Sequence, residues 1–165
     1  MSEKKFELEL VELKNKEQHN VVVGVSHFIK TVEDVHEMMV GAVPGAKFGL
    51  AFCEASGQML IRKTGTDNEL TREAVRMAKL VGAGHSFVLV MKDMFPINIL
   101  PNLKQITEVV TLYCATANPI QVVVAESKQG RGIMGVIDGG KPKGVEDEKG
   151  AADRKEFLRK IGYKM

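Results

Sequence analysis

The sequence predicts a single α/β domain spanning residues 1–165, organised as a three-layer α/β/α sandwich with a mixed β-sheet. Segments of strand length that are rich in β-branched residues alternate along the chain with helix-length segments in which apolar residues recur every three or four positions. No internal repeat, low-complexity tract or linker divides the chain. Interleaved strands and helices are expected to place helices on both faces of the sheet, and hairpin-like strand pairs argue against a purely parallel sheet.

The first half of the chain contains four predicted strands and one helix. Residues 6–13 alternate between apolar and acidic side chains, which indicates a half-buried strand. Residues 21–27 form a β-branched run that is typical of a strand buried on both faces. Thr31 is a residue type that caps helices, so a helix is predicted from there to residue 43. The other two strands, residues 47–54 and 58–62, are predicted to pair as a hairpin.

A second helix is predicted from residue 66 or 67 to residue 81, because its apolar residues keep the 3.6-residue period until Gly82. A surface loop is predicted where Gly, Lys and Glu are abundant, at residues 138–153. The remaining predicted elements are strands at residues 86–91, 109–115, 120–126 and 133–137, a short helix at residues 99–106 and a C-terminal helix at residues 154–161.

Composition argues against several classes of protein. The net charge is +2, aromatic residues make up 5% of the chain and there is no Trp, so a nucleic-acid-binding protein is not expected. The two cysteines lie in apolar runs without a CxxC pair, which indicates reduced core residues and no metal site. Apolar runs too short to cross a membrane and an N-terminus without a signal-peptide pattern lead us to expect a cytoplasmic protein.

A glycine-rich segment, residues 130–135, matches the pattern G-x-G-x-x-G. A dinucleotide site requires a strand before this pattern and a helix after it, whereas here a strand follows. We therefore predict a hairpin turn at this point. The alternative is a turn whose backbone N–H groups and Arg131 contact a phosphate.

Two of the four histidines are candidates for a reactive group. His27 ends a predicted buried strand, four residues before a helix whose first N–H groups are expected to be free to face a phosphoryl group. His85 follows the glycines Gly82 and Gly84 and begins another buried strand. A neutral imidazole is a good nucleophile or base near pH 7. The alternative for each is a structural histidine whose hydrogen bonds are satisfied.

Other polar residues at predicted strand ends and in loops suit a nucleotide ligand. Lys30 and Arg131 are cations that can neutralise phosphate. Carboxylates that end or follow strands are candidate magnesium ligands or bases, and asparagines beside prolines are candidates to bind a base edge or a ribose. Each has a plainer alternative, as a solvated charge or a turn residue. The carboxylates and asparagines are Glu54, Asp138, Asn98 and Asn118.

Several segments together resemble the adenosine-specific kinase family of small archaeal and bacterial proteins. The longest are residues 27–34, HFIKTVED, and residues 115–119, ATANP. The resemblance extends over nearly the whole chain through residues 48–52, 54–57, 84–85, 95–98, 135–139, 144–146 and 161–164. It implies a three-layer α/β/α domain, a homo-oligomer that is expected to be a trimer, binding of adenosine or AMP, and a stable phosphohistidine.

The resemblance and the residues together predict a phosphotransferase. The imidazole of His27 or His85 is expected to attack the γ-phosphoryl group of ATP, while Lys30 and Arg131 stabilise the charge, before the group passes to an adenosine hydroxyl. ATP is the expected cofactor and Mg²⁺ a further candidate, with no metal ligands assigned. Direct transfer without a phosphohistidine stays open. The rival prediction is a non-catalytic module that senses adenosine or AMP.

Overall fold

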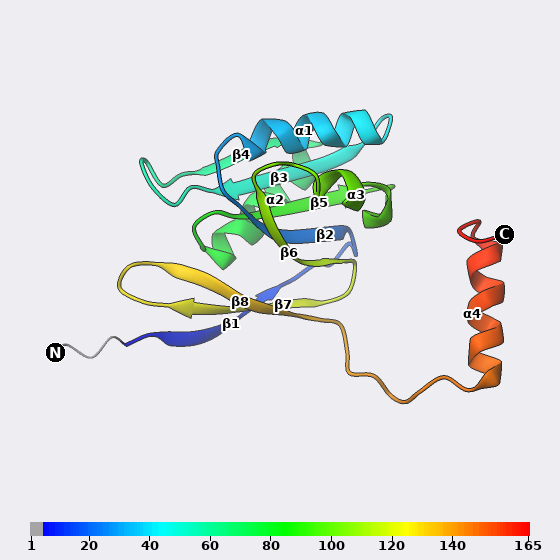
Figure 1. Cartoon of the computed structure of the whole chain (residues 1–165). Coiled ribbons are helices and arrows are strands. Elements are labelled where there is room, and N and C mark those ends of the chain that lie inside the picture. The colour runs from blue at the N-terminus through cyan, green and yellow to red at the C-terminus, as the bar shows by residue number, and fades with distance from the viewer. Residues whose placement is uncertain (1–4) are drawn as a thin grey trace.

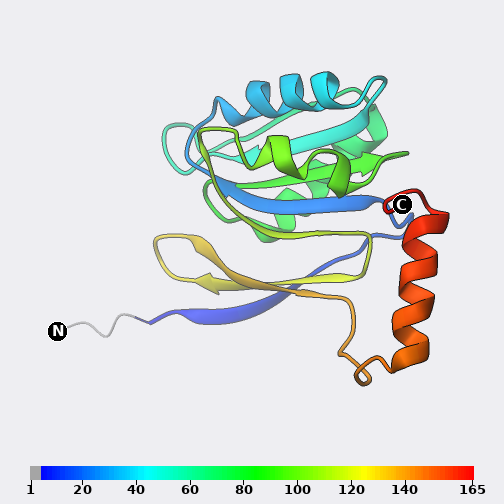
Figure 2. The same ribbon diagram turned by 45° about the vertical axis from the view of Figure 1, so that its right-hand side comes forward.

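A computed structural model describes residues 5–165 of the chain (Figures 1 and 2). Strands and helices alternate through most of it, as the sequence predicts. The elements are β1 (Glu7–Leu13), β2 (Asn20–Ser26), α1 (Thr31–Ala42), β3 (Lys47–Cys53), β4 (Ile61–Gly65), α2 (Asn68–Val81), β5 (Ser86–Lys92), the 3-10 turn η1 (Pro96–Asn98), α3 (Leu100–Leu103), β6 (Val109–Thr116), β7 (Ile120–Glu126), β8 (Arg131–Asp138) and α4 (Glu148–Lys160).

The strands form two sheets, one of five strands in the order β4-β3-β5-β2-β6 and one of three in the order β1-β7-β8. Every strand pair is antiparallel, so the expectation of a mixed sheet is wrong. The physical reason is that strands joined through a helix are not neighbours in the sheet: β5 lies between β2 and β3, and β3 lies between β4 and β5. Helix α1 joins β2 to β3 and α2 joins β4 to β5, and each of these strand pairs runs in one direction, but a third strand separates its members.

Helices cover both faces of the five-stranded sheet, but the third layer is not made of helices alone. One face packs against α1 and α3 through a cluster of buried residues that includes Phe48, Phe52 and Phe87. The opposite face packs against α2 and also against the three-stranded sheet, whose Val122 and Val124 join the same core. Figure 1 shows the smaller sheet below the larger one. The layers are therefore helices, a five-stranded sheet, and α2 together with a second sheet.

Helix α2 is fixed at both ends and approaches β3 closely. Asp67 caps it by accepting hydrogen bonds from the N–H groups of Glu69 and Leu70, and Gly82 ends it with a left-handed backbone. A Cβ atom at Gly49 would lie 2.2 Å from the backbone nitrogen of Thr71. The absence of a side chain at Gly49 therefore lets the backbones of β3 and α2 meet.

Several predicted boundaries need correction. Strand β4 begins at Ile61 and ends at Gly65, not at residues 58–62, because the preceding turn is longer and Met59 within it has a positive φ of 51°. Thr31 is the first helical residue of α1 and not its cap, since Lys30 takes that position. Helix α4 begins at Glu148, well before residue 154, because Asp147 accepts a hydrogen bond from the N–H of Gly150. No helix among residues 5–165 is long and apolar enough to cross a membrane.

Candidate functional site

The fold brings His27 and His85 together at one end of two neighbouring central strands of the five-stranded sheet. His27 follows β2 and His85 precedes β5, and these strands are antiparallel neighbours in which Val25 pairs with Ser86. The N–H of Ser26 donates a hydrogen bond to the carbonyl of His85 at 2.9 Å. The two imidazole rings stand edge to face, with centroids 6.3 Å apart. Both candidate nucleophiles therefore belong to one site.

His85 is held in a constrained position. Its φ is +64°, a left-handed conformation that costs a non-glycine residue free energy. Its N–H donates to the carbonyl of Cys53 at 2.7 Å, and its ring stacks on the buried ring of Phe52 with centroids 5.9 Å apart. A strained backbone with fixed partners is typical of a residue whose position matters for function.

His27 is exposed and lies in a short loop, residues 27–30, between β2 and α1. Its N–H donates to the carbonyl of Glu108 at 2.8 Å. The first N–H groups of α1 are not free, contrary to expectation, because those of Thr31, Val32 and Glu33 already donate to carbonyls of this loop. The helix end therefore lacks unpaired donors for a phosphoryl group on His27, and a cation has to supply that charge.

Two buried hydroxyl groups fix the base of this loop. Ser26 Oγ lies 2.5 Å from Thr31 Oγ1 and 3.1 Å from the carbonyl oxygen of Glu108. Thr31 Oγ1 donates to the carbonyl of Phe28 at 2.5 Å. These bonds tie the end of β2, the start of α1 and the residue before β6 to one another, so that the backbone around His27 is well supported.

Glu108 is a functional candidate that the sequence analysis missed. It directly precedes β6, and its side chain is only 5% exposed. One carboxylate oxygen lies 3.8 Å from Lys30 Nζ, while the other, Oε1, is buried and has no hydrogen-bond partner among the described residues. Buried polar atoms in folded proteins are almost always paired. Glu108 is therefore a buried carboxylate with incomplete hydrogen bonding at the base of the loop that carries His27.

Lys30 supplies positive charge beside Glu108 and His27. Its ammonium group is exposed and pairs with Asp34, one turn further along α1. The hydrogen bond to Asp34 raises the pKa of Lys30 above its ordinary value. Lys30 is therefore charged at neutral pH, and its side chain is exposed at the surface while it pairs with Asp34.

Polar residues thus lie in a row at one end of four neighbouring strands of the sheet. The strand order places Glu54 after β3, His85 before β5, His27 after β2 and Glu108 before β6, with neighbouring strands roughly 4.8 Å apart. A pair of imidazoles between two carboxylates, with Lys30 nearby, is a set of groups suited to nucleophilic attack, proton transfer and charge neutralisation.

The sequence model of the adenosine-specific kinase family matches residues 11–164. The chain belongs to this family. The crystal structure of PH1918 protein from Pyrococcus horikoshii OT3 is similar to it, with 41% sequence identity and a TM-score of 0.93, over 98% of this chain and 99% of that chain. No curated protein matches the sequence. The resemblance carried by residues such as 27–34 is confirmed.

In this adenosine-specific kinase family member, Glu54 is engaged with its own turn. Its carboxylate accepts hydrogen bonds from the N–H of Leu60 at 2.7 Å and from Arg62 Nε at 2.9 Å. The bond from Leu60 is the main cause that lowers the pKa of Glu54 below its ordinary value. Glu54 is therefore ionised at neutral pH and closes the turn between β3 and β4.

A groove of about 690 Å³ opens beside Glu54 and Gly84, and Gly84 directly precedes His85 in the chain. Its walls come from the β3–β4 turn, the C-terminal end of α2 and the β7–β8 hairpin, with Leu60, Lys79 and Arg131 among the lining residues. The groove is lined by both apolar and charged side chains, a mixture that suits a nucleotide.

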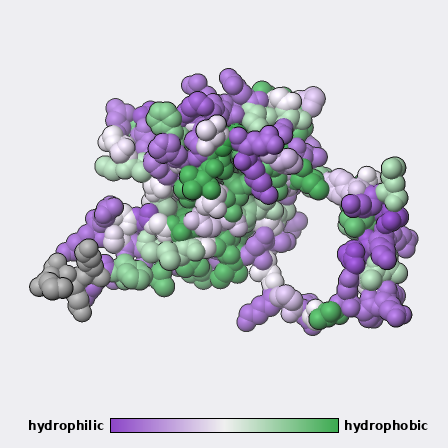
Figure 3. Space-filling model, viewed as in Figure 1, coloured by the Kyte–Doolittle hydropathy of each residue, from purple (hydrophilic) through white to green (hydrophobic). Residues whose placement is uncertain are grey.

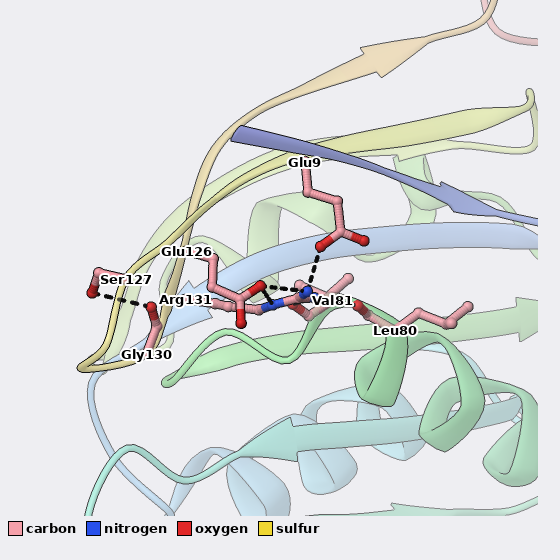
Figure 4. A network of polar contacts seen from close by, with 7 residues as sticks. All are labelled: Glu9, Leu80, Val81, Glu126, Ser127, Gly130 and Arg131. Carbon is pink, nitrogen blue, oxygen red and sulfur yellow. Dashed lines mark hydrogen bonds and ion pairs between the residues drawn. The ribbon is translucent and has the colours of Figure 1, made fainter. Parts of the chain in front are cut away.

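Arg131 lies in this groove wall, but its guanidinium group already has partners (Figure 4). It pairs with Glu126 at 2.7 Å and with Glu9, and it donates to the carbonyl of Leu80 at 3.1 Å. The bond to Glu126 is the main cause that raises the pKa of Arg131. The hairpin predicted at Gly130 is present, since Ser127 and Gly130 exchange backbone hydrogen bonds between β7 and β8. Arg131 therefore joins three strands to the end of α2.

The remaining predicted site residues lie at the opposite end of the sheet. Asn98, the last residue of η1, accepts a hydrogen bond from the N–H of Phe95, which caps this turn after the far end of β5. Asn118, between β6 and β7, donates to Asp138 at 3.0 Å. These three residues therefore stabilise turns away from the histidines. Among residues 5–165, no three or more His, Cys, Asp or Glu side chains gather in an arrangement that could hold a metal ion.

Proposed function

We propose that the protein transfers a phosphoryl group from ATP to adenosine through a phosphohistidine. The observation that carries this proposal is the pairing of His27 with His85 beside Lys30 and the buried Glu108, in a chain of the adenosine-specific kinase family. His27 is the better candidate for the nucleophile. It is exposed and lies next to Lys30, whereas His85 is packed on Phe52 and is placed to orient the ring of His27.

The first step forms the phosphohistidine. A ring nitrogen of His27 attacks the γ-phosphorus of ATP, a nitrogen–phosphorus bond forms, the bond from the γ-phosphorus to the β–γ bridging oxygen breaks, and ADP leaves with the bonding electrons. Lys30 stabilises the charge on the transferred group, since its ammonium group is charged and its exposed side chain lies in the same short loop as His27. The groove that Gly84 lines, one residue before His85, is the proposed ATP site, and Mg²⁺ is proposed to arrive with the ATP phosphates.

The second step releases AMP. A hydroxyl oxygen of adenosine attacks the phosphorus, the nitrogen–phosphorus bond breaks, and the hydroxyl proton passes to the carboxylate of Glu108, whose Oε2 faces Lys30. Phe28 is 52% exposed beside His27 and offers an aromatic face on which adenine can stack. ATP, the phosphoryl donor, and adenosine, the phosphoryl acceptor, would thus approach the histidine pair from two sides.

One observation favours the rival function, a module that binds adenosine or AMP without turnover. The second cation predicted for phosphate, Arg131, is held by Glu9, Glu126 and the end of α2. That leaves Lys30 as the cation placed beside His27 in the described part of the chain. A site with little positive charge binds a nucleoside more readily than it stabilises a phosphoryl transition state.

The experiment incubates the full chain with ATP labelled at the γ-phosphate and Mg²⁺, with and without adenosine. It follows AMP formation and acid-labile label on the protein. We expect wild type to be labelled and to form AMP. His27→Asn should lose both by about 100-fold or more, and His85→Asn should be labelled more slowly. His19→Asn, remote from the site, is the matched control.

The other outcomes separate the rival proposals. AMP formed without label would support direct transfer. Label lost in His85→Asn and kept in His27→Asn would exchange the two roles. Label kept but AMP lost in Glu108→Gln would support Glu108 as the proton acceptor of the second step. Adenosine binding without AMP above the protein-free blank would overturn the kinase and favour the sensor.

A further inference from the structure

A second pocket lies at the end of the five-stranded sheet opposite to the histidines. It has a volume of about 690 Å³ and opens between the β1–β2 loop (residues 14–19), the N-terminal half of α2 and the last residue of β5. His27 follows β2 and His85 precedes β5, whereas this pocket lies where β2 begins and β5 ends. The length of these seven-residue strands, roughly 20 Å, separates it from the proposed site of phosphoryl transfer.

Hydrogen bonds fix the walls of this pocket. In the β1–β2 loop, Asn15 donates to the carbonyl of His19 at 2.7 Å and accepts from the N–H of His19 at 3.0 Å. Arg76 on α2 donates to the carbonyl of Lys14 at 2.5 Å and pairs with Glu73 at 2.5 Å. Arg76 thus joins α2 to the start of the loop, while Glu73 balances its charge. The pocket therefore has a fixed shape before any ligand binds.

The lining residues carry more positive than negative charge. Four cations and three carboxylates line the pocket. The pairing of Arg76 with Glu73 accounts for one of each, so three lysines remain against two glutamates. One of these glutamates, Glu69, lies in the first turn of α2, where the positive end of the helix dipole offsets part of its charge. The three lysines are Lys14, Lys16 and Lys92.

The ammonium groups of these three lysines lack close partners. All three residues are exposed, and none of their side chains forms an ion pair or a hydrogen bond with another described residue. Lys92 also lies directly opposite Lys47 in the pairing of β5 with β3, and like charges at such positions repel each other. Asp67 attracts both lysines through space, but its carboxylate already accepts hydrogen bonds from the N–H groups of Glu69 and Leu70. The three ammonium groups therefore remain available to an anion.

The chemistry of the pocket selects a small anion with more than one charged group. Lysine ammonium groups are compact charges that bind phosphate and carboxylate oxygens. Because the lysines come from two separate elements, a ligand needs at least two oxyanion groups to contact them together. Among the described lining residues only Leu70 is apolar, so a nucleoside base or a lipid chain gains little here. The volume falls in the range of small-molecule sites.

The pocket is open to solvent. Helix α4 contributes none of the described lining residues, and Figure 3 shows open space between that helix and the body. A small anion can therefore reach the exposed lysines without a movement of the chain.

We propose that this pocket is a second ligand site, which binds a small anion carrying two or more phosphate or carboxylate groups. Lys14 and Lys16 hold the ligand from the β1–β2 loop, and Lys92 holds it from the end of β5. The ligand is distinct from the nucleotide and adenosine of the proposed reaction. The proposal therefore stands independently of the proposed phosphoryl transfer.

The test titrates the full chain with tripolyphosphate and, separately, with citrate. Isothermal titration calorimetry follows binding at about 0.15 M salt, where exposed charges further apart than about 8 Å are largely screened. We expect wild type to bind at least one of the two probes. Lys14→Gln/Lys16→Gln/Lys92→Gln should bind it at least about 10-fold more weakly, because charge-assisted contacts are lost.

A matched control removes the same amount of charge elsewhere. The variant Lys141→Gln/Lys143→Gln/Lys155→Gln alters three exposed lysines that do not line the pocket. It should keep the affinity of wild type, because distant charges are screened. Far-UV circular dichroism confirms that both triple variants fold.

Backbone amide signals of a ¹⁵N-labelled chain locate the bound probe. The probe should shift the signals of residues 14–19 and 69–76. A preference for tripolyphosphate would identify a phosphate ligand, and a preference for citrate a carboxylate ligand. Absence of binding by both probes, equal affinity in the two triple variants, or shifts confined to residues 27–30 and 84–86 would overturn the proposal.

Discussion

The ring of His85 lies against the ring of Phe52 at an interplanar angle of 22°, on a backbone whose φ at His85 is +64°. The stacking and the strained backbone act in opposite directions on the stability of the fold. Stacking stabilises the native position of the imidazole, whereas the left-handed conformation costs roughly 1–2 kcal/mol for a residue with a Cβ atom.

This strain leads to a prediction for two variants that both lack the imidazole. His85→Gly should be more stable than His85→Ala by about 1 kcal/mol, because glycine adopts a positive φ without a steric penalty. Chemical denaturation of the two variants measures the difference. An alanine variant as stable as the glycine variant would show that the backbone at residue 85 is relaxed. Both variants should lose normal phosphoryl transfer.

Arg131 should prove to be a structural residue. Arg131→Met should lower the free energy of unfolding by about 1–2 kcal/mol, because the bonds to Glu126, Glu9 and the carbonyl of Leu80 are lost. Although Arg131 lines the proposed ATP groove, its guanidinium group is held by Glu126 and Glu9, so the variant should still be labelled by ATP under conditions in which the fold is intact. Urea denaturation and the labelling assay check the two parts separately. A stable but unlabelled variant would return Arg131 to the phosphate site.

Asp67 should contribute to stability in a pH-dependent way. Asp67→Ala removes the cap of α2 and should cost about 1 kcal/mol at pH 7. The N–H of Leu70 is the main cause that lowers the pKa of Asp67 in the fold. A lowered folded-state pKa means that the stabilisation is complete above the unfolded-state pKa, about 4, and is lost as the pH falls through the folded-state value.

The measurement for Asp67 is the unfolding free energy of wild type and Asp67→Ala from pH 7 down to pH 3. The difference between the two proteins should shrink at the acidic end. Asp67→Asn serves as the control, since asparagine also caps helices and does not titrate. A difference that is constant across this range would rule out an ionised cap.

Cys114 should be unreactive in the folded protein. Burial raises the pKa of its thiol to about 11, and burial likewise raises that of Cys53. Because the thiolate is the reactive form, neither cysteine should react with a disulfide reagent at pH 8 until the protein is unfolded. Absorbance of the released chromophore follows the reaction, and Cys114→Ala assigns the signal. Rapid reaction of native protein would show that this core opens readily.

The hydrophobic pattern predicted the elements better than it predicted their pairing. Residues 120–126 form a strand with the predicted bounds, and α2 ends at residue 81 as expected, because burial and capping are local properties. Strand direction depends on which strands lie side by side. The sequence pattern holds no direct information on the insertion of β5 between β2 and β3, so the sheet was wrongly predicted as mixed.

The wrong prediction of strand direction also explains why some residues of the candidate site were predicted and Glu108 was missed. Polar residues that follow strands are the natural candidates in a parallel sheet, and this reasoning selected Glu54 and His27. In an antiparallel sheet, a residue that precedes one strand lies beside the residue that follows the neighbouring strand. Glu108, which precedes β6, therefore lies at the same end of the sheet as His27, which follows β2. The rule for parallel sheets also selected Asp138, which ends β8 at the other end of the molecule. Asn98 and Asn118 were selected as asparagines beside prolines in loops, which does not indicate at which end of the sheet a loop lies.

Gly49 has a mechanical consequence for the histidines. With no side chain at this position, the backbone of α2 lies so close to β3 that any larger residue at position 49 would force the two elements apart. The carbonyl of Cys53, at the end of the same strand, holds the backbone of His85. The missing Cβ atom of Gly49 thus helps to position the imidazole of His85, because Gly49 lies four residues before Cys53 on the same strand.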